Sequence, residues 1–149
     1  MRLLPIAVFG LCLAACSRPS DPVRDFSSRE VTMPDGKTVI AEVMMNPVDM
    51  TRGMMFRTSL EPDRGMLFVH GAPGQFTYFT YQVKIPIDII WMDPNHRVTE
   101  ISANTPPCPS KSARQCPLYG GHSTALYVLE LGGGMAAKYG VQIGSIINF

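Results

Sequence analysis

Two carboxylates within apolar segments are the side chains best placed to do chemistry. Asp88 falls in the run Pro86-Ile87-Asp88-Ile89-Ile90-Trp91, and Glu130 falls in Tyr127-Val128-Leu129-Glu130-Leu131. A carboxylate in an apolar strand must be paired or protonated. Arginine offers a bidentate partner for a carboxylate. Three arginines are candidates for this role: Arg52, Arg57 and Arg64.

Two interpretations of these residues stay open. In the first, Asp88 forms a buried structural ion pair with an arginine and fixes a helix-turn segment onto a sheet. In the second, the same groups bind an anion or a small polar ligand, together with Gln82 and Lys84. Glu130 takes the same two interpretations. Asp88 and Glu130 on adjacent strands would also suit an acid/base pair. A cavity holding both carboxylates and an arginine would favour an enzyme.

Methionines and histidines are the potential metal ligands. Thioethers suit Cu(I) in an oxidising compartment, but methionine is also an ordinary filler of apolar cores. The histidines have no mutual ligand spacing, so no zinc site is expected. We expect no bound metal or cofactor, with a methionine-rich copper-handling protein as a weaker alternative. The clustered methionines are Met44, Met45, Met50, Met54 and Met55, and the histidines are His70, His96 and His122.

Residues 1–15 have the features of a bacterial lipoprotein signal peptide. Arg2 gives a positive start, and residues 3–13 are apolar but too short for a stable membrane span. Small residues directly before Cys16 indicate cleavage there and acylation of that cysteine, which would hold the protein at a membrane. Ser17 favours the outer membrane, with the protein facing the periplasm. An ordinary signal peptide with an incidental cysteine is the alternative.

The segment after Cys16 predicts a flexible tether over residues 16–28, because it is polar and contains two prolines. Removal of Arg2 with the signal peptide leaves 12 basic residues against 12 acidic ones. A net charge of zero argues against a nucleic-acid partner, which would need a basic stripe.

Cys108 and Cys116 are the two cysteines that remain beyond the signal and the lipid attachment site. In an exported chain their expected state is a disulfide. A redox-active pair is the alternative, but the spacing is not C-x-x-C.

The longest strand-like run covers residues 78–92, where every odd position from Phe79 to Trp91 is apolar. We expect this run to be the central strand, with a bulge or an unpaired edge at Pro86. Short strands and frequent Gly and Pro turns predict a mainly β domain over residues 29–149, an antiparallel sandwich or partly open barrel with two short helices. The other strands are expected at 29–33, 38–45, 66–70, 98–103, 125–131 and 145–149, and the helices at 46–53 and 135–139.

Four ordered motifs resemble the bacterial and archaeal family known as domain of unknown function 192. They are Arg52-Gly53-Met54-Met55-Phe56-Arg57, Asp63-Arg64-Gly65-Met66-Leu67-Phe68, and the two runs around Asp88 and Glu130. The resemblance covers about residues 29–149 and implies an exported, mainly β fold, but no activity. The family usually has Met-Lys-Asn before the Pro-x-Asp motif, where this chain has Thr80, Tyr81 and Gln82.

These observations favour a lipid-anchored accessory protein of the cell envelope that binds a small polar ligand or a partner protein. The ligand is expected at the face of residues 78–88 and at the loop that carries the cysteines. A hydrolase-like enzyme using Asp88 and Glu130 with an arginine is the alternative function.

Overall fold

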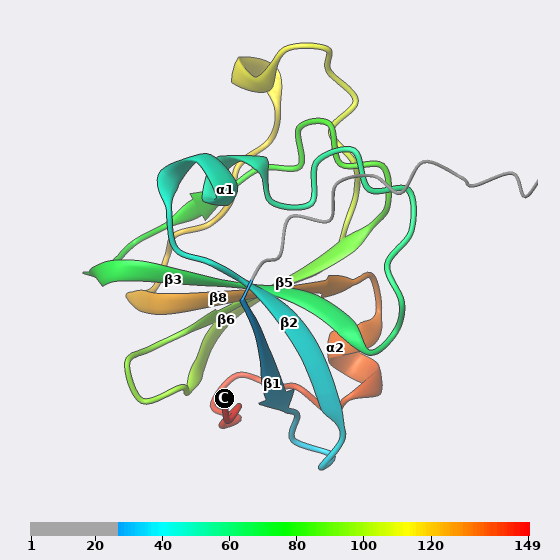
Figure 1. Ribbon diagram of the computed structural model, residues 1–149. Helices are drawn as coiled ribbons and strands as arrows, with labels where there is room; N and C mark the ends of the chain where they lie inside the picture. Colours follow the sequence, from blue (N-terminus) through cyan, green and yellow to red (C-terminus); the bar gives the residue numbers. More distant parts are fainter. Residues whose placement is uncertain (1–26) are drawn as a thin grey trace, which may run out of the picture.

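The computed structural model describes residues 27–149. The predicted signal peptide, the acylation of Cys16 and most of the tether therefore lie outside the described residues. A six-stranded sheet with the order β1-β2-β3-β8-β5-β6 dominates the rest (Figure 1). Its strands are β1 (Ser28–Thr32), β2 (Thr38–Met44), β3 (Arg64–Gly74), β5 (Ile87–Met92), β6 (Val98–Thr105) and β8 (Ala125–Gly132).

Two short strands and three short helices complete this region. Strands β4 (Thr77–Tyr78) and β7 (Tyr119–Gly120) form a separate two-stranded sheet. The helices are α1 (Pro47–Arg52), α2 (Met135–Lys138) and the short 3₁₀ helix η1 (Ala113–Gln115). The prediction of a mainly β fold with two short helices is confirmed. The main sheet is open, because its strand order ends at β1 on one side and at β6 on the other. It is also mixed, because β2 and β3 are parallel whereas the other neighbours are antiparallel.

The sheet separates two apolar cores. One core holds Leu129, Leu131, Ile90 and Met92, and Ala136 of α2 packs into it. The opposite core lies on the side of α1; its members include Phe68, Ile89, Trp91 and Val128. Figure 1 shows α1 above the sheet and α2 below it. Because successive residues of a strand point to opposite faces, each central strand supplies side chains to both cores.

Local sequence signals explain α1. The Asn46 side chain accepts a hydrogen bond from the backbone N–H of Asp49 at 2.9 Å, and Pro47 occupies the first turn, where no N–H is needed. The helix ends at Arg52, directly before Gly53, which has a φ of 40°. The predicted helix start and end are both confirmed.

The predicted continuous strand over residues 78–92 is wrong. Thr77 and Tyr78 form β4, the chain then leaves the sheet, and β5 begins only at Ile87, directly after Pro86. Proline lacks the N–H that a ladder requires, and Gln82 has a φ of 58°, which is incompatible with a strand. Within residues 79–85 only Thr80 and Val83 are buried, so the alternating pattern there does not mark one buried face.

Two other predicted elements also differ. The strand predicted at 66–70 is longer in the structure, because β3 continues to Gly74, and its pairing with β8 shifts register between Val69 and Gly74. The predicted last strand at 145–149 forms only two isolated bridges, between Arg97 and Ile146 and between Thr32 and Asn148. These bridges bring the end of the chain beside β1.

Candidate functional site

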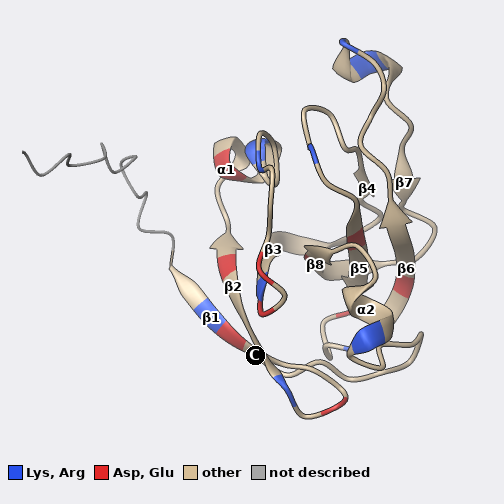
Figure 2. Ribbon diagram, turned by 90° about the vertical axis from the view of Figure 1, so that its right-hand side faces the viewer, with Lys and Arg blue, Asp and Glu red and all other residues tan. Residues whose placement is uncertain are grey.

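A cavity of about 390 Å³ lies over the sheet on the side of α1. Figure 2 shows α1 rising above β2 and β3, whereas β4 and β7 rise on the side of β5 and β6. Residues 50–55 line one side of the cavity, and residues 75–79 with Tyr81 and Val83 line the other. The side chains of Phe68, His70 and Glu130 complete the lining from β3 and β8.

Glu130 is the one carboxylic acid among the lining residues. In the register of the sheet it lies between Met66 of β3 and Ile89 of β5, and Met66 lies beside Glu42 of β2. Residue Glu130 is 4% exposed, and its Oε2 atom has no hydrogen-bond partner in the described part of the chain. A buried carboxyl oxygen without a donor is unusual in a native protein.

Burial raises the pKa of Glu130 to about 8, although the positive charge of Arg57 acts in the opposite direction. Arg57 donates no hydrogen bond to Glu130 Oε2, and its Nη2 atom donates to both carboxylate oxygens of Glu42 at 2.7 and 2.6 Å. Glu130 is therefore largely protonated near neutral pH and ionises at mildly basic pH.

His70 and Tyr78 form a second polar group in the cavity. The Nε2 atom of His70 lies 3.1 Å from the hydroxyl oxygen of Tyr78. Burial lowers the pKa of His70 and so favours its neutral form. Burial, and then the charge of Glu130, raises the pKa of Tyr78. The cavity thus contains an acid, a neutral imidazole and a phenol.

Aromatic rings hold Tyr78 in place. Its ring makes edge contacts with Phe68 and Trp91, at centroid distances of 5.2 and 5.8 Å. Phe76 stacks on His70 at 3.5 Å, and its carbonyl oxygen accepts a hydrogen bond from Trp91 Nε1 at 2.8 Å. These contacts fix one wall of the cavity against the core.

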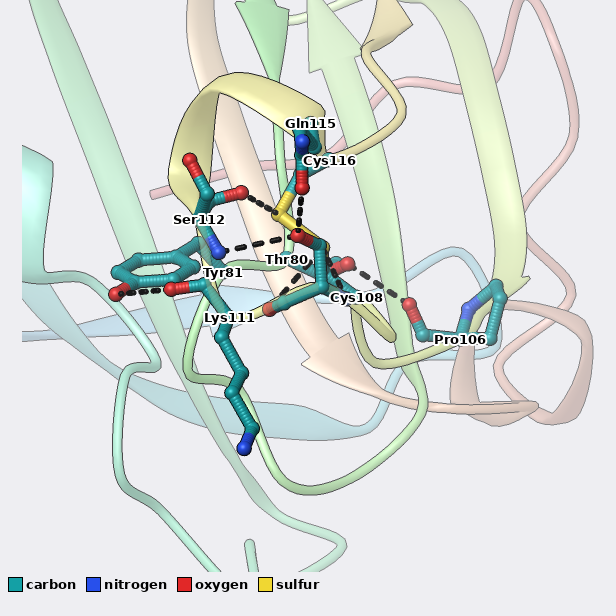
Figure 3. Close-up of a disulfide and its surroundings, with 9 residues drawn as sticks. Thr80, Tyr81, Pro106, Cys108, Lys111, Ser112, Gln115 and Cys116 are labelled. Atoms are coloured by element: carbon teal, nitrogen blue, oxygen red, sulfur yellow. Dashed lines mark hydrogen bonds between the residues drawn. A yellow bond between two sulfur atoms is a disulfide. The ribbon is translucent and has the colours of Figure 1, made fainter.

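A disulfide joins Cys108 and Cys116, so the predicted pairing is confirmed. This disulfide supports the same wall of the cavity. The backbone N–H of Cys108 donates to the carbonyl oxygen of Thr80, and the Thr80 hydroxyl donates to the carbonyl oxygen of Pro106 (Figure 3). The Tyr81 hydroxyl donates to the carbonyl oxygen of Lys111 at 3.3 Å. The disulfide-closed loop therefore holds the segment that carries Tyr81.

Asp88 is not part of this cavity. Its carboxylate accepts hydrogen bonds from the backbone N–H groups of Asn104, Gly134 and Ala136, at 2.7, 3.0 and 2.7 Å. Two of these donors belong to the first turn of α2, which has no side-chain cap of its own. The prediction that an arginine pairs with Asp88 is wrong, because backbone donors take that place.

The predicted acid/base pair is also wrong. Asp88 lies opposite Leu131 and faces the core on the side of α2, whereas Glu130 lies opposite Ile89 and faces the cavity. The sheet separates the two carboxylates, so they cannot act on one substrate atom.

The other predicted site residues are dispersed. Arg52 lines the cavity, and Arg57 is engaged by Glu42. Arg64 is exposed, with its Nε atom 3.9 Å from Asp63. Lys84 Nζ donates to Gln82 Oε1 on the loop after β4. Of the seven proposed ligand-binding residues, the cavity lining contains only Arg52 and Glu130.

Sequence reasoning missed His70 and Tyr78 as a pair. Tyr78 lies at the end of the predicted ligand-binding face, whereas the sequence indicates His70 only as a potential metal ligand. Their separation of eight residues matches no sequence motif. The two side chains meet because of the shift in register of β3 and the short connection from β3 to β4.

The clustered methionines separate into three groups. Met44 is buried in the core, Met45 is 69% exposed, and Met50, Met54 and Met55 line the cavity. Within residues 27–149, no group of three or more His, Cys, Asp or Glu side chains is placed to hold a metal ion. No helix in the same range is long and apolar enough to cross a membrane.

Two solved structures resemble this fold. A protein of unknown function from Novosphingobium aromaticivorans superimposes with a TM-score of 0.73 at 26% identity, over 96% of this chain and 100% of the other. A Sinorhizobium meliloti protein, provisionally described as a transcription regulator, superimposes with a TM-score of 0.72 at 24% identity, over 83% of this chain and 94% of the other. The second likeness concerns the fold alone. No curated protein matches the sequence.

The four sequence motifs lie at or within helix α1 and strands β3, β5 and β8. The motif at 52–57 ends α1 and leads into the cavity wall, and the motif at 63–68 forms the start of β3. The motifs around Asp88 and Glu130 are β5 and β8. The model of the family DUF192, described as "Uncharacterized ACR", matches residues 30–149. The chain therefore belongs to the DUF192 family.

Proposed function

We propose that this protein is a lipid-anchored binding protein of the cell envelope that holds a small molecule in the cavity over β3 and β8. The observation that carries the proposal is Glu130, a buried carboxylic acid whose Oε2 atom has no partner in the described chain and which lines a cavity of about 390 Å³. Cavities of this size with an apolar lining and few polar groups are typical of small-molecule sites.

Binding is favoured over hydrolysis. Glu130 is the one carboxylic acid in the cavity lining, so a mechanism that needs two carboxylates has no second carboxylate there. The aromatic wall and the methionines of residues 50–55 suit contact with an apolar body rather than with a water-rich reaction centre.

A screen of small molecules by ligand-observed NMR and thermal unfolding of the full-length protein tests the proposal. Thr51→Trp places a bulky ring at the cavity, because Thr51 is an exposed lining residue of α1. Val48→Trp is the matched control, since Val48 is 70% exposed on the same helix and does not line the cavity. We expect compounds that bind wild type and Val48→Trp but not Thr51→Trp. Binding that Thr51→Trp leaves unchanged would place the site elsewhere.

Copper handling is the second candidate, favoured by the three methionines that line the same cavity. Titration with Cu(I) in competition with a chromogenic chelator tests it. Cu(I) affinity should then fall when Met50, Met54 and Met55 are replaced by leucine.

A further inference from the structure

We propose that the molecule bound in the cavity carries an ammonium or guanidinium group that pairs with Glu130, joined to an apolar body that lies against the aromatic wall. This inference rests on the proposed function and names the chemical class of the ligand. It requires a carboxyl group that lacks a donor, no cation of the protein in position to supply one, and a wall that favours positive charge.

The first requirement is met by Glu130. Its flanking residues across the sheet are Met66 and Ile89, which offer no donor from their side chains. The Oε2 atom is buried and has no partner in the described chain. A ligand N–H⁺ group would supply a charge-assisted hydrogen bond to this oxygen.

The second requirement concerns the charged and titratable groups around Glu130. Arg57 contributes positive charge, but its Nη2 atom is held by both oxygens of Glu42. His70 is within hydrogen-bonding distance of Tyr78, and burial favours its neutral form. Arg52 lines the cavity but is exposed, so water screens its charge. The ion pair of Glu130 is thus left for a ligand to complete.

The third requirement is met by the wall opposite α1. Four aromatic residues are among those that line the cavity: Phe76, Tyr78, Phe79 and Tyr81. The face of an aromatic ring carries negative potential and attracts a cation that approaches it within about 6 Å. The same rings provide apolar surface for the body of the ligand.

A neutral ligand would use Glu130 differently, because protonated Glu130 would donate a hydrogen bond to a carbonyl oxygen. The two ligand classes differ in their dependence on pH. A cation binds the ionised form of Glu130, whose pKa is about 8, so its affinity should rise by roughly tenfold per pH unit below that value. A neutral acceptor should bind more weakly as pH rises.

Benzylamine, benzyl alcohol and benzoate are matched probes, since they share one ring and differ in charge. Isothermal titration calorimetry of the full-length protein at pH 6, 7 and 8 should show that benzylamine binds most tightly of these three probes. Its affinity should increase with pH, and buffers of different ionisation enthalpy should reveal release of a proton. Nα-acetyl-lysine methylamide tests whether the ammonium group comes from a polypeptide; binding tighter than that of benzylamine would support the chemistry and identify this source.

Glu130→Gln keeps the shape of the side chain and removes its charge. It should weaken benzylamine binding by about tenfold or more. Glu61→Gln, at an exposed carboxylate outside the cavity, is the control and should leave affinity unchanged. Any one of three results would overturn the inference. Benzyl alcohol or benzoate could bind as tightly as benzylamine, the affinity of benzylamine could fall as pH rises, or Glu130→Gln could leave benzylamine binding unchanged.

The proposed function is tested separately by Thr51→Trp. If compounds from the screen bind wild type but not Thr51→Trp, while benzylamine fails to bind, the ammonium inference is wrong and the cavity remains a binding site. If no compound distinguishes Thr51→Trp from Val48→Trp, the proposed function and the inference both fail.

Discussion

Asp88 and Glu130 lie on neighbouring strands, and their side chains point to opposite faces of one sheet. Three backbone N–H groups satisfy the carboxylate of Asp88, whereas Glu130 Oε2 has no partner in the described chain. The first carboxylate joins β5 to α2 and to the end of β6. The second lines a cavity. Two acidic residues in apolar strands thus have separate roles, one in stability and one in the candidate site.

Asp88→Asn should strongly destabilise the fold. The amide keeps one acceptor oxygen, and its NH₂ group would face at least one backbone donor that the carboxylate now satisfies. We expect the free energy of unfolding to fall by about 2–4 kcal/mol, as measured by urea unfolding.

Asp63→Asn is the control for this change, because Asp63 is exposed and lies 3.9 Å from Arg64 Nε. It should cost less than about 0.5 kcal/mol. Equal urea midpoints for wild type and Asp88→Asn would contradict the capping role of Asp88.

Glu130→Gln should stabilise the protein at high pH. The folded-state pKa of about 8 lies above the ordinary value of 4.5, so between these values the native state holds a proton that the unfolded state has lost. Wild-type stability is therefore full below about pH 4.5 and falls as pH rises toward 8, by up to about 1.4 kcal/mol per pH unit. Glutamine cannot ionise and does not incur this loss.

Urea unfolding at pH 5, 7 and 9 measures the difference between Glu130→Gln and wild type. The advantage of the variant should grow from pH 5 to pH 9, whereas Glu61→Gln should show no such trend. An advantage that is independent of pH would mean that Glu130 has the same pKa in the folded and unfolded states.

Loss of the disulfide should loosen one wall of the cavity. The chain-entropy model gives a cost of about 2–3 kcal/mol for the Cys108→Ser/Cys116→Ser variant. Because Cys108 N–H bonds to Thr80, amide hydrogen exchange should accelerate in residues 79–83 as well as in residues 105–122. Faster exchange confined to residues 105–122 would show that the loop does not support the cavity wall.

Gly120→Ala should disrupt the pairing of β4 with β7. Gly120 has a φ of 73°, and a Cβ atom there would overlap the indole ring of Trp91. Gly36→Ala is the matched control, since Gly36 has a φ of 82° but no atom within 4 Å of the added Cβ. We expect about 1–2 kcal/mol for the control and at least about 1 kcal/mol more for Gly120→Ala, measured by thermal unfolding. Equal losses would show that Trp91 moves without cost.

Lipidation at Cys16 is predicted from sequence and can be measured directly. Intact mass of protein extracted from membranes should correspond to a chain that begins at an acylated Cys16. Cys16→Ala should release the protein from the membrane fraction. A mature chain that begins elsewhere and stays in the soluble fraction would exclude the lipid anchor.

Signals between near neighbours determined several features from the sequence alone. Asn46 and Pro47 start α1 and Gly53 follows its last residue, because the capping contacts span only a few residues. Cys108 and Cys116 were predicted to pair because two cysteines remain in an exported chain. The mainly β class followed from the spacing of short apolar runs and turn residues.

The partners of Asp88 could not be predicted. Its burial was evident from Ile87 and Ile89, but its donors are backbone N–H groups 16 and 46–48 residues away in the chain. Every residue except proline carries an N–H group, so no residue type marks these donors in a sequence. Arginine is the partner that the sequence suggests for a buried carboxylate, but in the tertiary structure backbone N–H groups donate to Asp88 instead.

The cavity was decided entirely by tertiary structure. Glu130, His70 and Tyr78 come from β8, β3 and β4, and which face each side chain occupies depends on strand register. A change of one residue in register moves a side chain to the opposite face. The sequence determined that Asp88 and Glu130 lie in apolar strands. The register and the break at Pro86 determined that only Glu130 faces the cavity.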